Sequence, residues 1–167
     1  TTAANTVMSA GGTVTLRSNQ TIQLSKAHIA SPTAQLFNIV INSDLDGNSS
    51  GRIALTTSNL LSSGGNITLG GGADPLTGNA FGVAGAVEGI NLNASTLNAA
   101  GGNISLRGTG YTVAGVSNYG IILQAAAKAQ TSGSGTVTLT GTGGAGTNTN
   151  YGLYLTGAGT AVSSVDG

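Results

Sequence analysis

The sequence predicts an all-β protein folded as a parallel β-helix, in which short strands stack coil upon coil. Three observations lead to this fold class. A motif of glycines followed by alternating apolar residues recurs along the chain. The predicted strands are too short to bury a face alone, so they must stack. The chain has 29 glycines for corners but only 2 prolines, which leaves most backbone amides able to donate within a ladder.

The recurring motif reads Gly-Gly-Asn-Ile-Ser-Leu at residues 101–106. Its other copies occupy residues 11–16, 64–69 and 134–139, so successive copies start 53, 37 and 33 residues apart. Repeats at such periods are typical of solenoids and propellers. Each copy reads as a turn followed by a short strand with two apolar side chains on one face.

A second element, glycine followed by apolar-x-apolar, lies between the copies. It occupies residues 89–92, 120–123 and 152–155, with a looser copy at 51–55. The small-residue corner 93–100 joins it to the next motif, and a longer variable segment completes the unit. A unit of about 33 residues with two or three short strands and a protruding loop suits one coil of a β-helix. Propellers and sandwiches use longer, hairpin-paired strands, and no tight Asn-Gly or Asp-Gly turn joins two such runs here.

Stacking predicts which side chains face the core. The apolar residues of each motif point inward and meet their counterparts one coil away: Ile104 between Ile67 and Val137, and Leu106 between Leu69 and Leu139. Ser105 and its counterparts Thr68 and Thr138 point outward. We expect one solenoid segment over residues 1–167, with about six coils spaced about 4.8 Å apart. Residues 17–63 fit least well, and we interpret them as one extra coil with strands near 21–24 and 37–41.

The composition excludes several functions. Only 6% of the residues are charged, and five basic residues balance five acidic ones. A net charge near zero provides no field to attract nucleic acid, and no apolar run has the about 18 residues that crossing a bilayer requires. We therefore predict neither nucleic-acid binding nor membrane insertion. The absence of cysteine excludes disulfides and thiolate chemistry.

The acidic residues do not suggest catalysis. Only Asp44 and Asp46 are close in sequence, and His28, the single histidine, has no recognisable catalytic partner. We predict no enzyme activity and no cofactor. Asp44, Asp46 and Asn48 resemble the start of a calcium loop, but Ser49 and Leu55 stand where an EF-hand needs glycine and glutamate. An ordinary turn also explains this composition.

Four asparagines begin the triplet Asn-x-Ser/Thr, an acceptor pattern for N-linked sugar. They are Asn48, Asn66, Asn93 and Asn103. Asn66 and Asn103 also stand at strand starts that the repeat dictates, so the pattern has a structural explanation too. Modification at these four residues is a hypothesis.

Two further features concern the surface. Tyr119 and Tyr151 occupy equivalent places on neighbouring coils, which predicts either a stabilising stack or a site that stacks against sugars. Outward Thr-x-Thr pairs, as at Thr13 and Thr15, are also a device of ice-binding solenoids, although asparagine replaces threonine in two of four copies. Because loops carry recognition more often than scaffolds do, residues 73–87 and 111–118 are the candidate recognition segments.

The motif, followed by Gly-Thr-Gly at 108–110 or Gly-Thr-Gly-Gly at 141–144 and then by Tyr-Gly-Ile/Leu-x-Leu, resembles the repeats of filamentous-haemagglutinin-like exoproteins of bacterial two-partner secretion. The high-molecular-weight adhesins belong with these. The resemblance implies a right-handed parallel β-helix that is exported and forms a rod at the cell surface.

We therefore expect an extracellular structural or adhesive stalk segment, cut from a longer repeat array. Its expected partners are glycans or proteins on host or neighbouring cells, and further copies bound end to end. An ice-binding solenoid and a polysaccharide-binding or -degrading β-helix are the alternatives.

Overall fold

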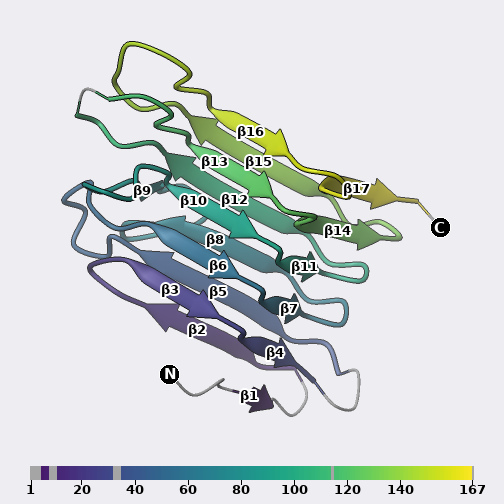
Figure 1. The fold of residues 1–167 in the computed structure, drawn as a ribbon. Coiled ribbons are helices and arrows are strands. Elements are labelled where there is room, and N and C mark those ends of the chain that lie inside the picture. The colour runs from purple at the N-terminus through teal and green to yellow at the C-terminus, as the bar shows by residue number, and fades with distance from the viewer. Residues whose placement is uncertain (1–4, 8–10, 32–34, 114, 167) are drawn as a thin grey trace.

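The computed structural model describes residues 5–7, 11–31, 35–113 and 115–166, with side-chain burial from residue 11 onward. The described chain is all-β and follows the predicted parallel β-helix. In each coil it visits three sheets in turn (Figure 1).

The first sheet contains β2 (Thr13–Arg17), β5 (Asn38–Ser43), β8 (Ile67–Gly71), β12 (Ile104–Thr109) and β15 (Val137–Thr142), and the short β9 (Ala80–Phe81) also pairs with β12. The second contains β3 (Ile22–Ser25), β6 (Ile53–Thr56), β10 (Ile90–Asn93), β13 (Ile121–Gln124) and β16 (Leu153–Thr156). The third contains β1 (Asn5–Val7), β4 (His28–Ala30), β7 (Asn59–Leu61), β11 (Thr96–Asn98), β14 (Lys128–Ser132) and β17 (Ala161–Val165). Every pair of these strands is parallel.

The described chain makes fewer coils than the about six expected. From β2 to β15 it makes four full turns, and β15, β16 and β17 form a fifth layer. In Figure 1 the first sheet runs leftward behind the second sheet, which runs rightward, while the chain climbs. That path is right-handed, the hand that parallel crossovers almost always take.

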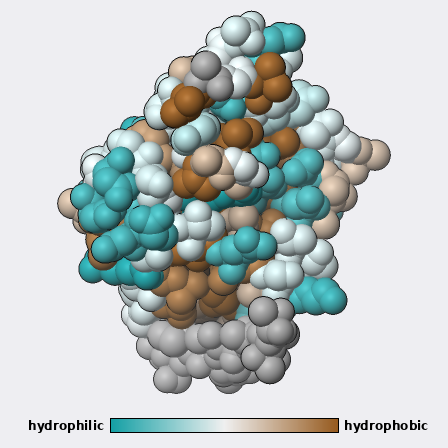
Figure 2. Space-filling view, turned by 60° about the vertical axis from the view of Figure 1, so that its left-hand side comes forward, coloured by the Kyte–Doolittle hydropathy of each residue, from teal (hydrophilic) through white to brown (hydrophobic). Residues whose placement is uncertain are grey.

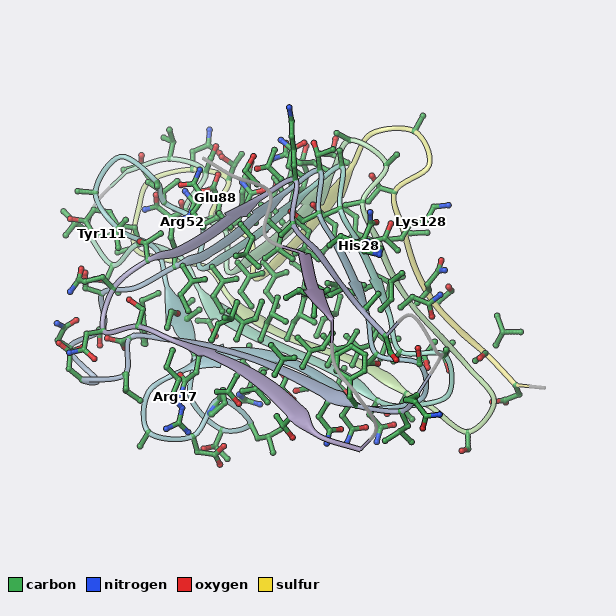
Figure 3. All side chains as sticks on the ribbon, turned by 90° about the horizontal axis from the view of Figure 1, so that it is seen from below. Arg17, His28, Arg52, Glu88, Tyr111 and Lys128 are labelled. Atoms are coloured by element: carbon green, nitrogen blue, oxygen red, sulfur yellow. The ribbon has the colours of Figure 1, made fainter. Side chains whose placement is uncertain are left out.

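The predicted core register is confirmed. Ile104 pairs with Ile67 and Val137, and Leu106 pairs with Leu69 and Leu139. The second sheet repeats this arrangement in ladders such as Leu24–Leu55–Leu92–Leu123–Leu155. The inward residues of the middle coils form one continuous apolar cluster, which Figure 3 shows end-on between the three sheets.

The third sheet corrects the prediction of a plain corner at residues 93–100. That segment contains strand β11, which pairs with β7 and β14. Leu97 is its inward residue and is fully buried. The strand is short and its neighbours are Asn, Ala, Ser and Thr, so its single apolar side chain gave no alternating pattern to recognise.

The irregular region 17–63 does hold one extra coil. Val14 pairs with Ile39, and Ile39 pairs with Ile67, so the chain advances 25 and then 28 residues between strands of the first sheet. Strand β5 lacks the Gly-Gly motif, because Leu36 and Phe37 precede it. These two coils are shorter than the later ones because less chain connects their first and second sheets.

The two glycines of the motif serve different purposes. The first has a positive φ, 102° at Gly64 and 116° at Gly101, which side-chain-bearing residues rarely adopt. The second faces the backbone of the preceding coil. A Cβ atom on Gly102 would lie 2.1 Å from the carbonyl oxygen of Gly65, and one on Gly65 would lie 1.9 Å from that of Phe37. This corner therefore stacks only when the second residue has no side chain.

An asparagine ladder follows the corner on the outer face. The side-chain Oδ1 of Asn38 accepts the backbone N–H of Asn66 at 2.9 Å, and Asn66 accepts that of Asn103 at 2.8 Å. Asn103 in turn accepts the backbone N–H of Thr136 at 2.9 Å. From the second coil onward, each coil is thereby joined to the next by one bond additional to the strand ladders.

Candidate recognition sites

The connections from the first to the second sheet protrude along one edge of the coil (Figure 1). The first connection, residues 18–21, is short, and the longer ones are residues 44–52, 72–79, 82–89, 110–120 and 143–152. Figure 2 brings this side forward and shows hydrophobic patches interspersed with polar ones. Both predicted recognition segments lie here.

The predicted segment 73–87 is two loops rather than one, because strand β9 divides it. Its first part folds back over strand β8, where the Pro75 carbonyl oxygen is 2.1 Å from the position of a Cβ atom on Gly70. Asp74 organises this turn, since its carboxylate accepts the Leu76 N–H at 3.0 Å. Its second part forms a small antiparallel bridge between Val83 and Ala86.

The predicted segment 111–118 is an ordered arm, with Ala114 outside the described residues. The Asn118 N–H donates to Asn150 Oδ1 at 2.9 Å, and the Gly144 N–H donates to the Asn118 carbonyl oxygen at 2.8 Å. Ser117 and Thr149 share a hydroxyl hydrogen bond at 3.2 Å. This loop therefore stacks on the loop of the next coil, much as the strands do.

Charged and aromatic side chains follow one another from coil to coil along the same edge, just before the strands of the second sheet begin. Arg52 and Glu88, from neighbouring coils, form an ion pair at 3.3 Å. Burial lowers the pKa of Arg52, and the nearby Glu88 carboxylate acts in the opposite direction. Figure 3 shows this pair near Tyr111, on the opposite side of the coil from His28 and Lys128.

Tyr119, Tyr151 and Tyr154 lie along the same edge, in the coils closer to the C-terminus. The predicted stack of Tyr119 on Tyr151 is present, with ring centroids 6.1 Å apart and planes 14° apart. Tyr154, which the sequence did not single out, lies closer to Tyr119, at 4.8 Å. Because the rings face one another, much of their stacking surface is used internally. Tyr151 nevertheless remains 50% exposed.

The calcium candidates face different partners. Asp44 is 2% exposed, and its two carboxylate oxygens accept the N–H groups of Ser49 and Ser50, each at 3.2 Å. The exposed Asp46 instead accepts the Asn48 side-chain amide at 2.8 Å. The arrangement is a self-bonded turn. Among the described residues, no group of three or more His, Asp or Glu side chains is placed to hold a metal ion.

The four glycosylation candidates occupy three settings. Asn48 lies in the turn just described. Asn66 and Asn103 are exposed members of the asparagine ladder, which uses Oδ1 and not the Nδ2 atom that a sugar would modify. Asn93 is half-buried at the end of β10. His28 is exposed on β4 of the third sheet.

The hydroxyl face considered for ice binding is uneven. The outward rank of the first sheet reads Thr15, Val40, Thr68, Ser105 and Thr138. Thr68 is only 6% exposed, and Val40 interrupts the hydroxyls. A flat, regular threonine array is therefore not presented there.

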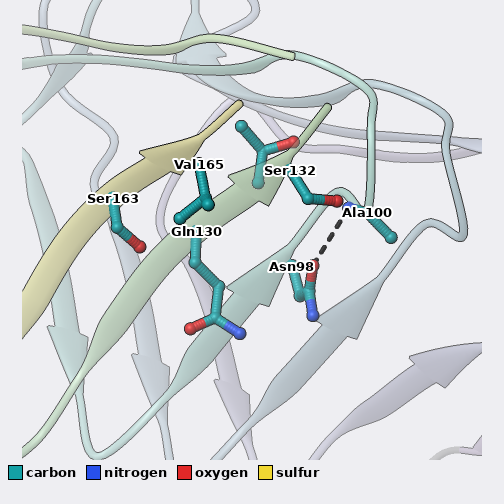
Figure 4. A pocket seen from close by; sticks show the side chains of 7 residues that line it. Asn98, Ala100, Gln130, Ser132, Ser163 and Val165 are labelled. Carbon is teal, nitrogen blue, oxygen red and sulfur yellow. Dashed lines mark hydrogen bonds between the residues drawn. The ribbon is translucent and has the colours of Figure 1, made fainter. Parts of the chain in front are cut away.

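A groove on the third sheet was missed at the sequence level. It has a volume of about 270 Å³ and lies across β11, β14 and β17 (Figure 4). Its lining consists of uncharged residues: Asn98, Ala100, Gln130, Thr131, Ser132, Ser163 and Val165. The residues come from three coils, and no motif links them in the sequence. Only the register of the third sheet brings them together.

Comparisons with known proteins do not assign the chain. No family model matches it, and no curated protein or solved structure matches it significantly. The resemblance to filamentous-haemagglutinin-like repeats therefore stays a prediction. The described residues include no helix long and apolar enough to cross a membrane.

Proposed function

We propose that this chain is a structural segment of a stiff rod at a bacterial cell surface, in a filamentous-haemagglutinin-like exoprotein. The observation that carries this proposal is the unbroken stacking of all three sheets. Core ladders, the asparagine ladder and the stacked loops 110–120 and 143–152 each connect one coil to the next. A rod built this way resists bending and stretching because deformation would break several ladders together.

The rod proposal includes association through the ends of the coil. In the fifth layer, Leu153 and Leu155 are 42% and 45% exposed, whereas Leu92 and Leu123 in the layers below are fully buried. No strand among the described residues pairs with the outer edges of β15 and β16. A further coil, from a second copy or from the same exoprotein, would cover these side chains and pair these edges.

Single-molecule force spectroscopy tests the mechanical role. The chain is placed between reference domains and pulled from its two ends. A rod segment should resist at forces comparable to those of the reference domains and extend in steps of one coil. Extension without a force peak would overturn the proposal.

Location and adhesion require their own measurement. Antibodies against the chain should label intact cells of the producing organism, and beads coated with the chain should attach to other cells. Labelling only after cell lysis would contradict the extracellular location. Surface labelling without bead attachment would leave a stalk without adhesive activity.

A further inference from the structure

The groove on the third sheet contains polar side chains that the fold does not use. The Gln130 side-chain amide and the Ser132 and Ser163 hydroxyls have no hydrogen-bond partner within the described part of the chain. Asn98 uses only Oδ1, which accepts the Ala100 N–H at 3.0 Å, so its Nδ2 stays available. Figure 4 shows Asn98, Gln130 and Ser163 along one side of the groove.

The residues paired in register with Asn98 along the third sheet change from apolar to polar where the groove begins. With Asn98 itself, the members of this series, from the N-terminus upward, are Val7, Ala30, Leu61, Asn98, Gln130 and Ser163. The first three strands thus place apolar residue types there, and the next three place two amides and a hydroxyl. The change coincides with the groove, because Asn98 is the first polar member and also its first lining residue.

The opposite side of the groove is formed by short side chains and is partly apolar. Ala100 lies at the corner with a positive φ of 48°, and its small side chain keeps that side open. Val165 is strongly exposed there, beside Ser132 of the neighbouring strand. The groove therefore offers neutral donors and acceptors on one side and an apolar contact on the other.

We propose that this groove binds a neutral saccharide chain. Neutral amides and hydroxyls match sugar hydroxyls, which both donate and accept, and Val165 matches the C–H face of a sugar ring. The three coils repeat the polar groups at about 4.8 Å along the groove. An extended saccharide presents its hydroxyl groups at a comparable repeat, so successive rings would meet successive coils.

Other ligand classes fit less well. The lining has no charged side chain to hold a phosphate or a carboxylate. An extended peptide bound to a sheet gains its affinity from an unpaired strand edge. The groove lies on the face of β11, β14 and β17. Both edges of β11 and β14 are paired, and a peptide at the outer edge of β17, the last strand of the sheet, would lie beside the groove and not across it. The site is independent of the rod proposal, since an isolated monomer contains the whole groove.

Titration followed by NMR of the isotope-labelled chain tests the assignment. The probes are hexamers of β-1,4-linked glucose, α-1,4-linked glucose and β-1,4-linked N-acetylglucosamine, each at millimolar concentration. At least one should shift the resonances of Asn98, Gln130 and Ser163 with a saturating curve. Gln130→Ala should weaken that binding by about tenfold.

Gln23→Ala is the matched control, because Gln23 is an exposed glutamine on the outer face of β3, outside the groove. It should leave the binding unchanged, and thermal unfolding verifies that both variants fold. The assignment is overturned if none of the three hexamers shifts the groove resonances. It is equally overturned if Gln130→Ala binds as tightly as Gln23→Ala. It is also overturned if a hexapeptide composed of Gly, Ser and Asn gives the same shifts. None of these outcomes affects the force measurement, so the rod proposal is judged separately.

Discussion

The carbonyl oxygen of Gly65 lies 2.1 Å from the point that a Cβ atom of residue 102 would occupy. The contact joins equivalent corners of two neighbouring coils. It explains why the second glycine of the motif recurs, and Gly135 repeats the relation one coil further on, with 2.3 Å to the Gly102 carbonyl oxygen.

Gly102→Asn should destabilise the chain by about 3 kcal/mol or more, because the neighbouring backbone cannot yield without separating two coils. Gly85→Asn is the matched control. Gly85 has a φ of 78° and no atom within 4 Å of its Cβ position, and asparagine tolerates this conformation. Urea unfolding followed by circular dichroism measures both. Equal losses would contradict the steric explanation.

The asparagine ladder should contribute measurably to stability. Asn103→Ala removes the acceptor of the Thr136 N–H and of the Thr136 hydroxyl at 3.0 Å. We expect a loss of about 1 kcal/mol in the free energy of unfolding. Asn19→Ala, at an exposed asparagine in the turn before β3, should change the free energy little. A Thr136 amide that exchanges its hydrogen no faster in Asn103→Ala would argue against the ladder.

Equivalent leucines should differ in importance according to their coil. Leu92→Ala opens a cavity in a fully buried layer and should lose about 2–5 kcal/mol. Leu155→Ala truncates the same ladder position in the fifth layer, where the side chain is already 45% exposed, and should lose about 1 kcal/mol. Chemical denaturation of dilute monomer compares them. A large loss for Leu155→Ala would show that this layer is covered in solution.

The ion pair between Arg52 and Glu88 should stabilise the loop edge. Their side chains are 13% and 20% exposed, so Glu88→Gln leaves a largely buried guanidinium without its partner. Although burial lowers the pKa of Arg52, arginine stays protonated at ordinary pH, so the charge remains. We expect a loss of about 1–2 kcal/mol in the free energy of unfolding. Asp166→Asn, at an exposed acid near the C-terminus, serves as the charge-matched control.

Calcium should not stabilise the turn at residues 44–50. Both carboxylate oxygens of Asp44 already accept backbone N–H groups, and Asp46 bonds Asn48 instead. Differential scanning calorimetry should give the same melting temperature with calcium chloride and with a chelator. A calcium-dependent rise that disappears in Asp46→Asn would establish the metal site after all.

The architecture can be predicted from the sequence, because the physical cause of each coil is local. Alternating Ile104 and Leu106 define an inward face, and the preceding glycines define a corner, so copies of the motif must stack in register. The same reasoning placed Tyr119 against Tyr151 and found the extra coil at Phe37 to Ile41. It overestimated the number of coils and missed β11, whose single apolar residue Leu97 makes no pattern.

The groupings of side chains on the surface follow only from the folded coils. Loop 111–118 reads as a free recognition segment, yet its hydrogen bonds to Asn150 and Gly144 make it part of the stack. Asp44 and Asp46 read as a pair, yet they hold different partners. The groove unites Asn98, Gln130 and Ser163, which are more than thirty residues apart in sequence. Such groupings depend on register between coils of unequal length, which no local pattern encodes.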